Sequence, residues 1–144
     1  MAARSKRSVG ARTAGREAAL QMLYQVDLSG VTPEQAVHAY WAHLGANREG
    51  EEFANSLVRG WAEERDRIDG IIREVSQHWR LERMARVDRN ILRLATYELL
   101  FVASVPRRVS LNEAIELGKR FGAEDSPAFV NGILDRIAAS VTKD

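Results

Sequence analysis

Apolar and polar positions recur with a helical period along most of the chain, and the most apolar stretch is residues 87–102, VDRNILRLATYELLFV. Its apolar side chains surround nearly the whole circumference of a helix, and such a helix has to be buried among other helices. Polar residues, mostly arginines, crowd only its first turns. We therefore expect a central helix whose first turns reach the surface.

The same period predicts further helices on both sides of this stretch. They cover residues 13–28, 33–44, 48–79, 110–121 and 126–141, with a single irregular turn at 81–84. Thr32 and Gln35 form a capping box ahead of the second helix, and Ser110 and Glu113 form another. Gly30 closes the first helix.

Two kinds of irregularity are expected inside these helices. The apolar stripe of residues 48–79 lapses into Glu-Glu-Arg-Asp-Arg, so we expect a break around residues 64–66 and about seven helices in all. Gly118 and Gly132 lie within helices, where glycine costs close to 1 kcal/mol relative to alanine. Each glycine is therefore expected to mark a close helix crossing.

The composition fits one all-α domain. The 144 residues are 45% apolar and 28% charged, with three prolines and no cysteine, which excludes disulfides and thiolate metal sites. No run approaches the length of a membrane span, and no apolar signal core follows the basic N-terminus. The sequence therefore predicts a cytoplasmic protein with no membrane segment.

The N-terminus is rich in basic residues. Residues 1–12 have no apolar period, so we expect a mobile basic arm ahead of a single helical domain over residues 13–144. Five positive charges precede the first acid, namely Arg4, Lys6, Arg7, Arg12 and Arg16. The chain uses 18 arginines and three lysines, a bias that favours planar, forked contacts to phosphate. The arm is either a solvated tail or a segment that orders on nucleic acid.

Glu98 is an unusual residue in the central helix, because its helical neighbours are apolar. A buried carboxylate without a partner is costly, so Glu98 must find backbone N–H groups or an arginine. The start of the helix near Ser110 is the expected partner, since its free N–H groups favour a carboxylate. We interpret Glu98 as structural rather than catalytic, because no companion acid, base or nucleophile lies nearby in the sequence.

The sequence contains no recognisable catalytic or cofactor motif. Glycine-rich phosphate loops, zinc-protease motifs and nucleophile elbows are all missing. His38 and His43 are five residues apart and therefore not on one helical face, and His78 has no evident companion. We expect no catalytic residue, metal or cofactor, and interpret the chain as a binding module.

The turn GAED before the last helix carries the candidate binding chemistry. Lys119 and Arg120 precede the turn, Asp125 lies within it, and Phe129 follows in the first turns of the next helix. One interpretation places Phe129 at the edge of the core, with the two cations complementing a helix dipole. The other stacks a base on Phe129, with the cations on adjoining phosphates.

Three ordered blocks of the sequence resemble the NusB family of bacterial transcription antitermination factors. The blocks are REAALQMLYQVD, VDRNILRLATYELL and NEAIELGKRFGAEDSPAFVNGILDRI. The resemblance implies an all-helical fold of two packed subbundles. It also implies binding of boxA-type single-stranded RNA from ribosomal RNA transcripts. The implied protein partner is NusE, a small-subunit ribosomal protein, within the antitermination complex with RNA polymerase.

The resemblance also implies roles for individual residues. RNA is expected on the arginine-rich N-terminal segment and on the turn with Asp125 and Phe129. Tyr24 and Asp88 are expected near the surface that contacts RNA and the partner. Some members of the family pair as homodimers, so the oligomeric state stays open. The competing class is a helical adaptor that binds only protein.

Overall fold

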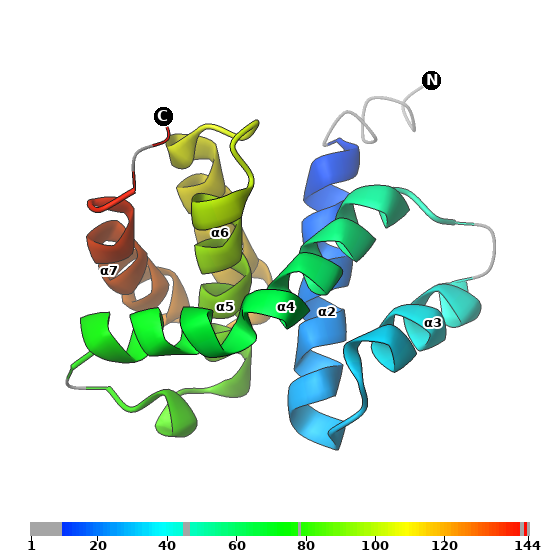
Figure 1. Cartoon of the computed structure of the whole chain (residues 1–144), viewed down its shortest axis with the longest axis horizontal. Coiled ribbons are helices and arrows are strands. Elements are labelled where there is room, and N and C mark those ends of the chain that lie inside the picture. The colour runs from blue at the N-terminus through cyan, green and yellow to red at the C-terminus, as the bar shows by residue number, and fades with distance from the viewer. Residues whose placement is uncertain (1–9, 45–46, 78, 142, 144) are drawn as a thin grey trace. The chain divides into compact units, whose positions relative to one another are not determined.

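The computed structural model describes residues 10–44, 47–77, 79–141 and 143, and all of its regular elements in these ranges are helical (Figure 1). The α-helices are α2 (Ala11–Ser29), α3 (Pro33–Leu44), α4 (Glu51–Val75), α5 (Arg86–Phe101), α6 (Arg107–Phe121) and α7 (Ser126–Ala138), and a 3₁₀ turn, η1 (Leu81–Arg83), precedes α5. The all-α prediction is confirmed. None of the helices in the described ranges is long and apolar enough to cross a membrane.

The chain divides into two compact units, residues 1–62 and 63–144, and the boundary falls within α4. In the first unit, the predicted helix signals are confirmed. Gly30 adopts φ 72° and donates its N–H to the carbonyl of Val26 at 2.9 Å, which closes α2. The N–H of Thr32 donates to Gln35 Oε1 at 2.9 Å, and the N–H of Gln35 donates to Thr32 Oγ1 at 3.1 Å. This reciprocal pair is the predicted capping box of α3.

Two glycines let α2 pass close to the start of α4 within the first unit. Gly50 adopts φ 76°, and a Cβ on it would overlap the carbonyl oxygen of Ala11 and lie 2.5 Å from the backbone nitrogen of Gly15. A Cβ on Gly15 would lie 2.9 Å from the carbonyl oxygen of Gly50. Backbone therefore packs directly on backbone at this crossing, which leaves no room for side chains.

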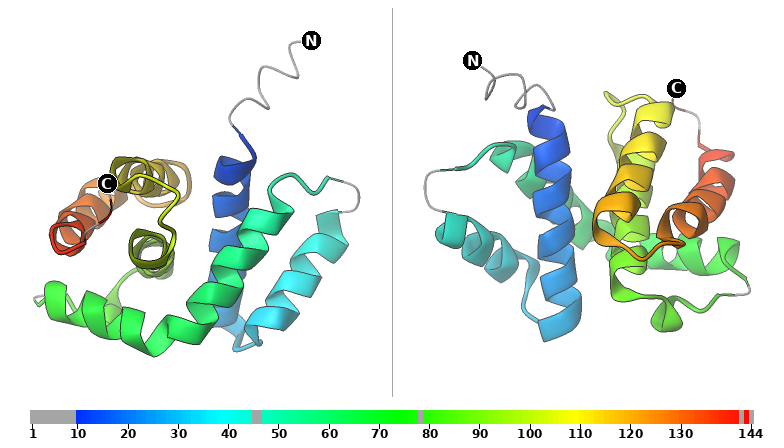
Figure 2. Two further views of the ribbon diagram at one scale, coloured as in Figure 1. Left: turned by 45° about the horizontal axis from the view of Figure 1, so that its top comes forward. Right: turned by 180° about the vertical axis from the view of Figure 1, so that it is seen from behind.

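The second unit is built around α5, which packs against α6 and α7 (Figure 2). Five apolar residues of α5 are buried as its sequence predicts, namely Ile91, Leu92, Leu94, Ala95 and Leu99, whereas Phe101 at the end of the helix is 38% exposed. On α7 the predicted inward positions Val130, Ile133, Leu134 and Ile137 are buried too. Helices α5, α6 and α7 thus pack against one another in pairs.

Two expectations about helix boundaries are wrong. The break expected at residues 64–66 does not occur, because α4 runs unbroken from Glu51 to Val75. Its exposed charged stretch has good helix formers, and Ile68 resumes the buried face seven residues after Trp61. The described residues therefore form six α-helices rather than about seven.

The start of α6 also differs from the expectation. Pro106 is the N-cap and Ser110 lies inside the helix, so the capping box predicted at Ser110 is absent. The Ser110 hydroxyl instead donates to Glu98 Oε1 at 2.9 Å, and both side chains are buried. Lys143 Nζ donates to Ser110 Oγ at 3.2 Å and to the carbonyl oxygens of Glu98 at 2.9 Å and Val102 at 3.1 Å. The Ser110 hydroxyl thus bonds the buried Glu98 carboxylate from inside α6, not from the helix start that we expected.

The two helix-interior glycines differ from each other. A Cβ on Gly118 would lie 3.3 Å from the backbone nitrogen of Pro127, so Gly118 marks a close approach of α6 to the start of α7, as predicted. A Cβ on Gly132 would meet nothing within 4 Å. The close crossing expected at Gly132 is therefore wrong, because its side of α7 faces open space.

Candidate nucleic-acid interface

The turn between α6 and α7 is tight and is shaped by contacts of its own backbone. A Cβ on Gly122 would lie 2.5 Å from the side chain of Ser126, so only glycine fits there. Ser126 Oγ accepts the N–H of Ala123 at 2.9 Å. Asp125, the N-cap of α7, is exposed and makes no side-chain cap hydrogen bond. Its carboxylate is therefore presented to solvent at the start of α7.

The basic residues at the end of α6 also face solvent. Lys119 is exposed, and its Nζ donates to Glu116 Oε2 at 3.2 Å. The guanidinium of Arg120 lies 5.7 Å from the ring centroid of Phe121, which is a cation–π contact. The four residues predicted at this turn, Lys119, Arg120, Asp125 and Phe129, thus lie on the segment from the end of α6 to the first turns of α7 in the second unit.

Phe129 is half-buried and contacts a second aromatic side chain. Its ring centroid lies 5.6 Å from that of Trp79, with the ring planes at 86°, an edge-to-face pair. Trp79 is 61% exposed. The neighbouring Val130 is fully buried, so Phe129 lies at the edge of the core rather than within it.

Trp79 is absent from the residues that the sequence pattern predicts as binding sites. The available signal was an aromatic residue beyond the end of the apolar stripe of α4 and directly before Arg80. Periodicity could not place it against Phe129, since 50 residues separate the two in the sequence. Its exposure and its aromatic partner come only from the fold.

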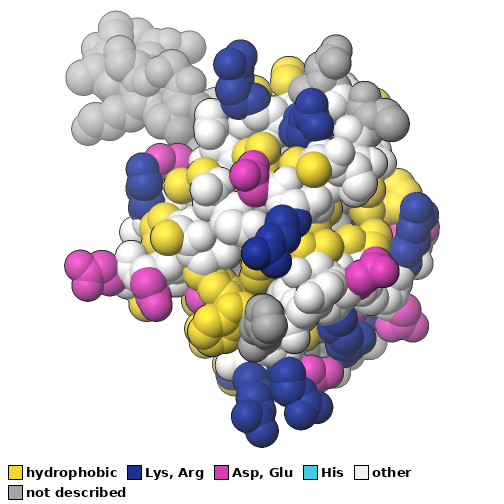
Figure 3. All heavy atoms as spheres, turned by 90° about the vertical axis from the view of Figure 1, so that its left-hand side faces the viewer, with side chains coloured by type: hydrophobic (Ala, Val, Ile, Leu, Met, Phe, Trp, Pro, Cys, Tyr) yellow, Lys and Arg dark blue, Asp and Glu magenta, His cyan; other side chains and the backbone are white. Residues whose placement is uncertain are grey.

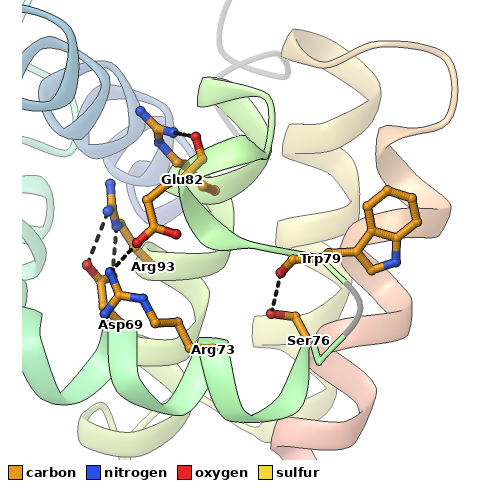
Figure 4. Close-up of polar contacts among 7 residues, drawn as sticks. Asp69, Arg73, Ser76, Trp79, Glu82 and Arg93 are labelled. Carbon is orange, nitrogen blue, oxygen red and sulfur yellow. Dashed lines mark hydrogen bonds and ion pairs between the residues drawn. The ribbon is translucent and has the colours of Figure 1, made fainter.

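An ion pair joins α4 to α5, and hydrogen bonds with Ser76 hold the backbone of Trp79 (Figure 4). Arg93 of α5 forms two hydrogen bonds with Asp69 of α4, at 2.9 and 3.1 Å, and both side chains are mostly buried. The buried Ser76 Oγ lies 3.1 Å from the carbonyl oxygen of Trp79, and the N–H of Trp79 donates to the carbonyl of Ser76 at 2.7 Å. The exposed indole therefore stands on a well-anchored backbone.

Arg73 and Glu82 form an exposed ion pair beside this segment, with 3.0 Å between Arg73 Nη2 and Glu82 Oε2. The pKa of Glu82 is lowered, first by a hydrogen bond from its own backbone N–H and then by Arg73. Glu82 therefore stays ionised at neutral pH.

Figure 3 shows a face on which apolar side chains gather in patches with Lys and Arg side chains beside them.

In the first unit, two of the predicted basic residues stack on one aromatic ring. The guanidinium carbons of Arg12 and Arg16 lie 5.1 and 5.3 Å from the centroid of Phe53. Arg12 is exposed and borders a groove of about 820 Å³, which Arg48 also lines. Arg16 is only 4% exposed, so it reaches a ligand only by leaving this position. Arg4, Lys6 and Arg7 lie outside the described residues.

The family model of the NusB family matches residues 13–139. The chain belongs to the NusB family. It is 51% identical over 133 residues to "Transcription antitermination protein NusB" of Sorangium cellulosum, an alignment that covers 92% of this chain and 95% of that one. The protein of the same name from Myxococcus xanthus is 47% identical over 139 residues, with 94% and 99% covered.

Solved NusB structures have the same fold. T. maritima NusB superposes with a TM-score of 0.82 and 40% identity, covering 90% of this chain and 92% of that one. A crystal structure of the antitermination factors NusB and NusE in complex with dsRNA gives a TM-score of 0.81 and 30% identity, covering 90% and 97%.

Two further residues that the NusB resemblance singles out have unlike surroundings. Tyr24, on α2 in the first unit, is half-buried. Asp88, in the first turn of α5 in the second unit, is 8% exposed, and its Oδ1 has no hydrogen-bond partner. A buried carboxylate oxygen with spare capacity is suited to accept a donor from a ligand or partner.

Proposed function

We propose that this NusB-family protein is a bacterial transcription antitermination factor that binds boxA-type single-stranded RNA of ribosomal RNA transcripts together with NusE. The relatives named above carry the antitermination role in their names, and one structural neighbour is a complex with NusE and RNA. The protein acts in the cytoplasm, by binding rather than by catalysis. Its partners are the RNA, NusE and, through them, the transcribing polymerase.

The observation that carries this proposal is the exposed turn between α6 and α7. It carries a half-buried aromatic ring, Phe129, in the first turns of α7 and two solvent-facing cations, Lys119 and Arg120, at the end of α6. Aromatic rings stack on unpaired bases and cations attract phosphates, so this combination suits single-stranded RNA. Arg12 and the basic residues before it supply further phosphate contacts.

The direct test is titration of the full chain with a boxA-like RNA and with a scrambled RNA of the same composition, each with and without NusE. Tighter binding of the boxA-like RNA, strengthened by NusE, is the expected result. Binding of NusE without binding of either RNA would instead identify a protein-only adaptor.

The basic arm is expected to contribute phosphate contacts. Deletion of residues 1–8 removes Arg4, Lys6 and Arg7, so the slope of log affinity against log salt should shrink by up to about 2, at roughly 0.7 per contact on single strands. RNA titrations over a range of salt concentrations measure the slope. A full-length variant with these three residues changed to glutamine is the matched control for chain length. Equal slopes for all three proteins would make the arm a solvated tail.

Phe129 is expected to stack on a base. Phe129→Ala should weaken RNA binding by roughly 1–3 kcal/mol and change the salt dependence little, because the ring contacts no phosphate. A core role would instead cost about 3–5 kcal/mol of unfolding free energy and leave the RNA affinity of the folded protein near normal. Melting curves and RNA titrations on the same variant separate the two outcomes.

Asp125 provides a contrasting variant in the same turn. Its side chain makes no cap hydrogen bond, so Asp125→Asn removes a charge with little effect on the start of α7. If the carboxylate only repels phosphate, this variant should bind RNA more tightly. Weaker binding would mean that Asp125 accepts a hydrogen bond from a base.

A further inference from the structure

The exposed indole of Trp79 separates two small grooves of the second unit. One groove, of about 230 Å³, is lined by Phe129, Gly132 and Arg136, among others. The other, of about 250 Å³, is lined by Arg73, Arg80 and Glu82, among others. Ser76, Gln77 and Trp79 line both. The first groove therefore has two aromatic rings in a mainly apolar lining, and the second carries two arginines and one acid.

We propose that Trp79 is a second base-stacking platform of the RNA site, with an unpaired base against Trp79 in the Phe129 groove and an adjoining phosphate on Arg73 and Arg80. This inference rests on the proposed RNA-binding function. It extends the RNA path beyond the turn between α6 and α7 and onto the segment that joins α4 to α5. None of these three residues belongs to the sites that the sequence predicts.

The geometry of the aromatic pair leaves room for a base. In an edge-to-face pair each ring is covered by its neighbour on one side at most, and the indole keeps 61% of its surface exposed. Figure 4 shows the indole directed away from the Asp69–Arg93 ion pair. A groove of about 230 Å³ is smaller than the roughly 300–1,000 Å³ of typical small-molecule pockets, so it suits one flat ring system.

The charge around the indole favours an anionic ligand over a neutral or basic one, and the exposed aromatic ring suits a nucleic acid among anionic ligands. Among the described residues that line the two grooves, the charged ones are three arginines, Arg73, Arg80 and Arg136, and one acid, Glu82. Arg136 donates to the carbonyl oxygen of Val75 at 3.2 Å, which holds it beside the aromatic groove. Arg73 forms a 3.0 Å ion pair with Glu82, whereas Arg80 attracts that carboxylate only through longer-range electrostatics, so Arg80 is the stronger candidate for a phosphate.

Hydrogen bonds hold the backbone of Trp79 in the structure. Its N–H donates to the carbonyl of Ser76, and Ser76 Oγ is bonded to the carbonyl of Ile72 at 2.6 Å. Backbone that is already held in place loses little conformational entropy on binding. The exposed indole of Trp79 is thus suited to stacking on a base.

The first experiment measures affinity for a boxA-like RNA with four full-length proteins: the unchanged chain, Trp79→Ala, Trp79→Phe and Phe101→Ala. Trp79→Ala should weaken binding about 5- to 100-fold, whereas Trp79→Phe, which keeps an aromatic face, should retain most of the affinity. Phe101 is an exposed aromatic residue of the same unit that lines neither groove, so its variant should bind normally.

Two further measurements distinguish base stacking from a purely structural role of Trp79. The first uses a series of RNAs, each lacking the base at one position. At one position, loss of the base should weaken RNA binding by the unchanged protein but not by Trp79→Ala. Trp41 and Trp61 are buried, so RNA should quench mainly the emission of Trp79. This quenching needs no variant and decides the question even if Trp79→Ala fails to fold.

The phosphate contact is tested with Arg80→Gln and, as a control, Arg83→Gln, an exposed arginine that lines neither groove. Arg80→Gln should reduce the slope of log affinity against log salt by roughly 0.7, and Arg83→Gln should not.

Two results together would overturn the role of Trp79 and leave the proposed function intact. The unchanged protein and Trp79→Ala would both prefer boxA RNA with equal affinity, and RNA would leave the tryptophan emission unaltered. If the unchanged protein has no preference for boxA RNA, the proposed function itself fails.

Discussion

Gly50→Ala should destabilise the folded protein by about 3–5 kcal/mol. A left-handed φ of 76° costs an alanine roughly 1–2 kcal/mol, and the new methyl group would overlap backbone atoms of Ala11 and Gly15 in α2. These atoms belong to a helix and cannot turn aside as a flexible side chain can. Urea unfolding of the unchanged protein and the variant measures the difference.

Gly70→Ala is the matched control for this prediction. Gly70 lies inside α4 at a position where a Cβ meets nothing within 4 Å and φ is not positive. The substitution should therefore stabilise the protein by up to about 1 kcal/mol, the difference in helix propensity. Equal and small effects for the two variants would contradict the backbone contact between α2 and the start of α4.

The helices themselves could largely be predicted, because their signals are local. The apolar period, Gly30 after α2 and the capping box of Thr32 and Gln35 depend only on residues within a few positions of each other. The exposed charged stretch in α4 misled the prediction of a break at residues 64–66. A solvated face and a helix end look alike in sequence when charges follow one another.

The candidate site was only partly predictable, because its parts meet through tertiary contacts. Lys119, Arg120, Asp125 and Phe129 lie close in sequence, so their common exposure on one turn could be expected. The pairing of Phe129 with Trp79 and the burial of Arg16 against Phe53 join distant segments. Ser110 illustrates the same limit, since it matches a capping signal but donates its hydroxyl to Glu98 across the unit.

Glu98, Ser110 and Lys143 form a polar chain that ties three parts of the second unit together. Lys143 Nζ donates to Ser110 Oγ, and Ser110 Oγ donates to Glu98 Oε1. The same ammonium group binds the carbonyl oxygens of Glu98, in the last turn of α5, and of Val102, the C-cap of α5, where a cation also complements the helix dipole. The chain therefore links α5, α6 and the segment after α7.

Glu98→Ala should lower the unfolding free energy by about 1–3 kcal/mol, because the buried hydroxyl of Ser110 loses its acceptor and a cavity replaces the side chain. RNA affinity should not change, since Glu98 lines neither groove beside Trp79. Glu64→Ala is the control, because the ion pair of Glu64 with Arg67 is partly exposed, spans 3.7 Å and is worth at most about 1 kcal/mol. Urea unfolding and RNA titration of both variants provide the measurements. If Glu98→Ala is as stable as the unchanged protein, the buried chain does not brace α5 against α6.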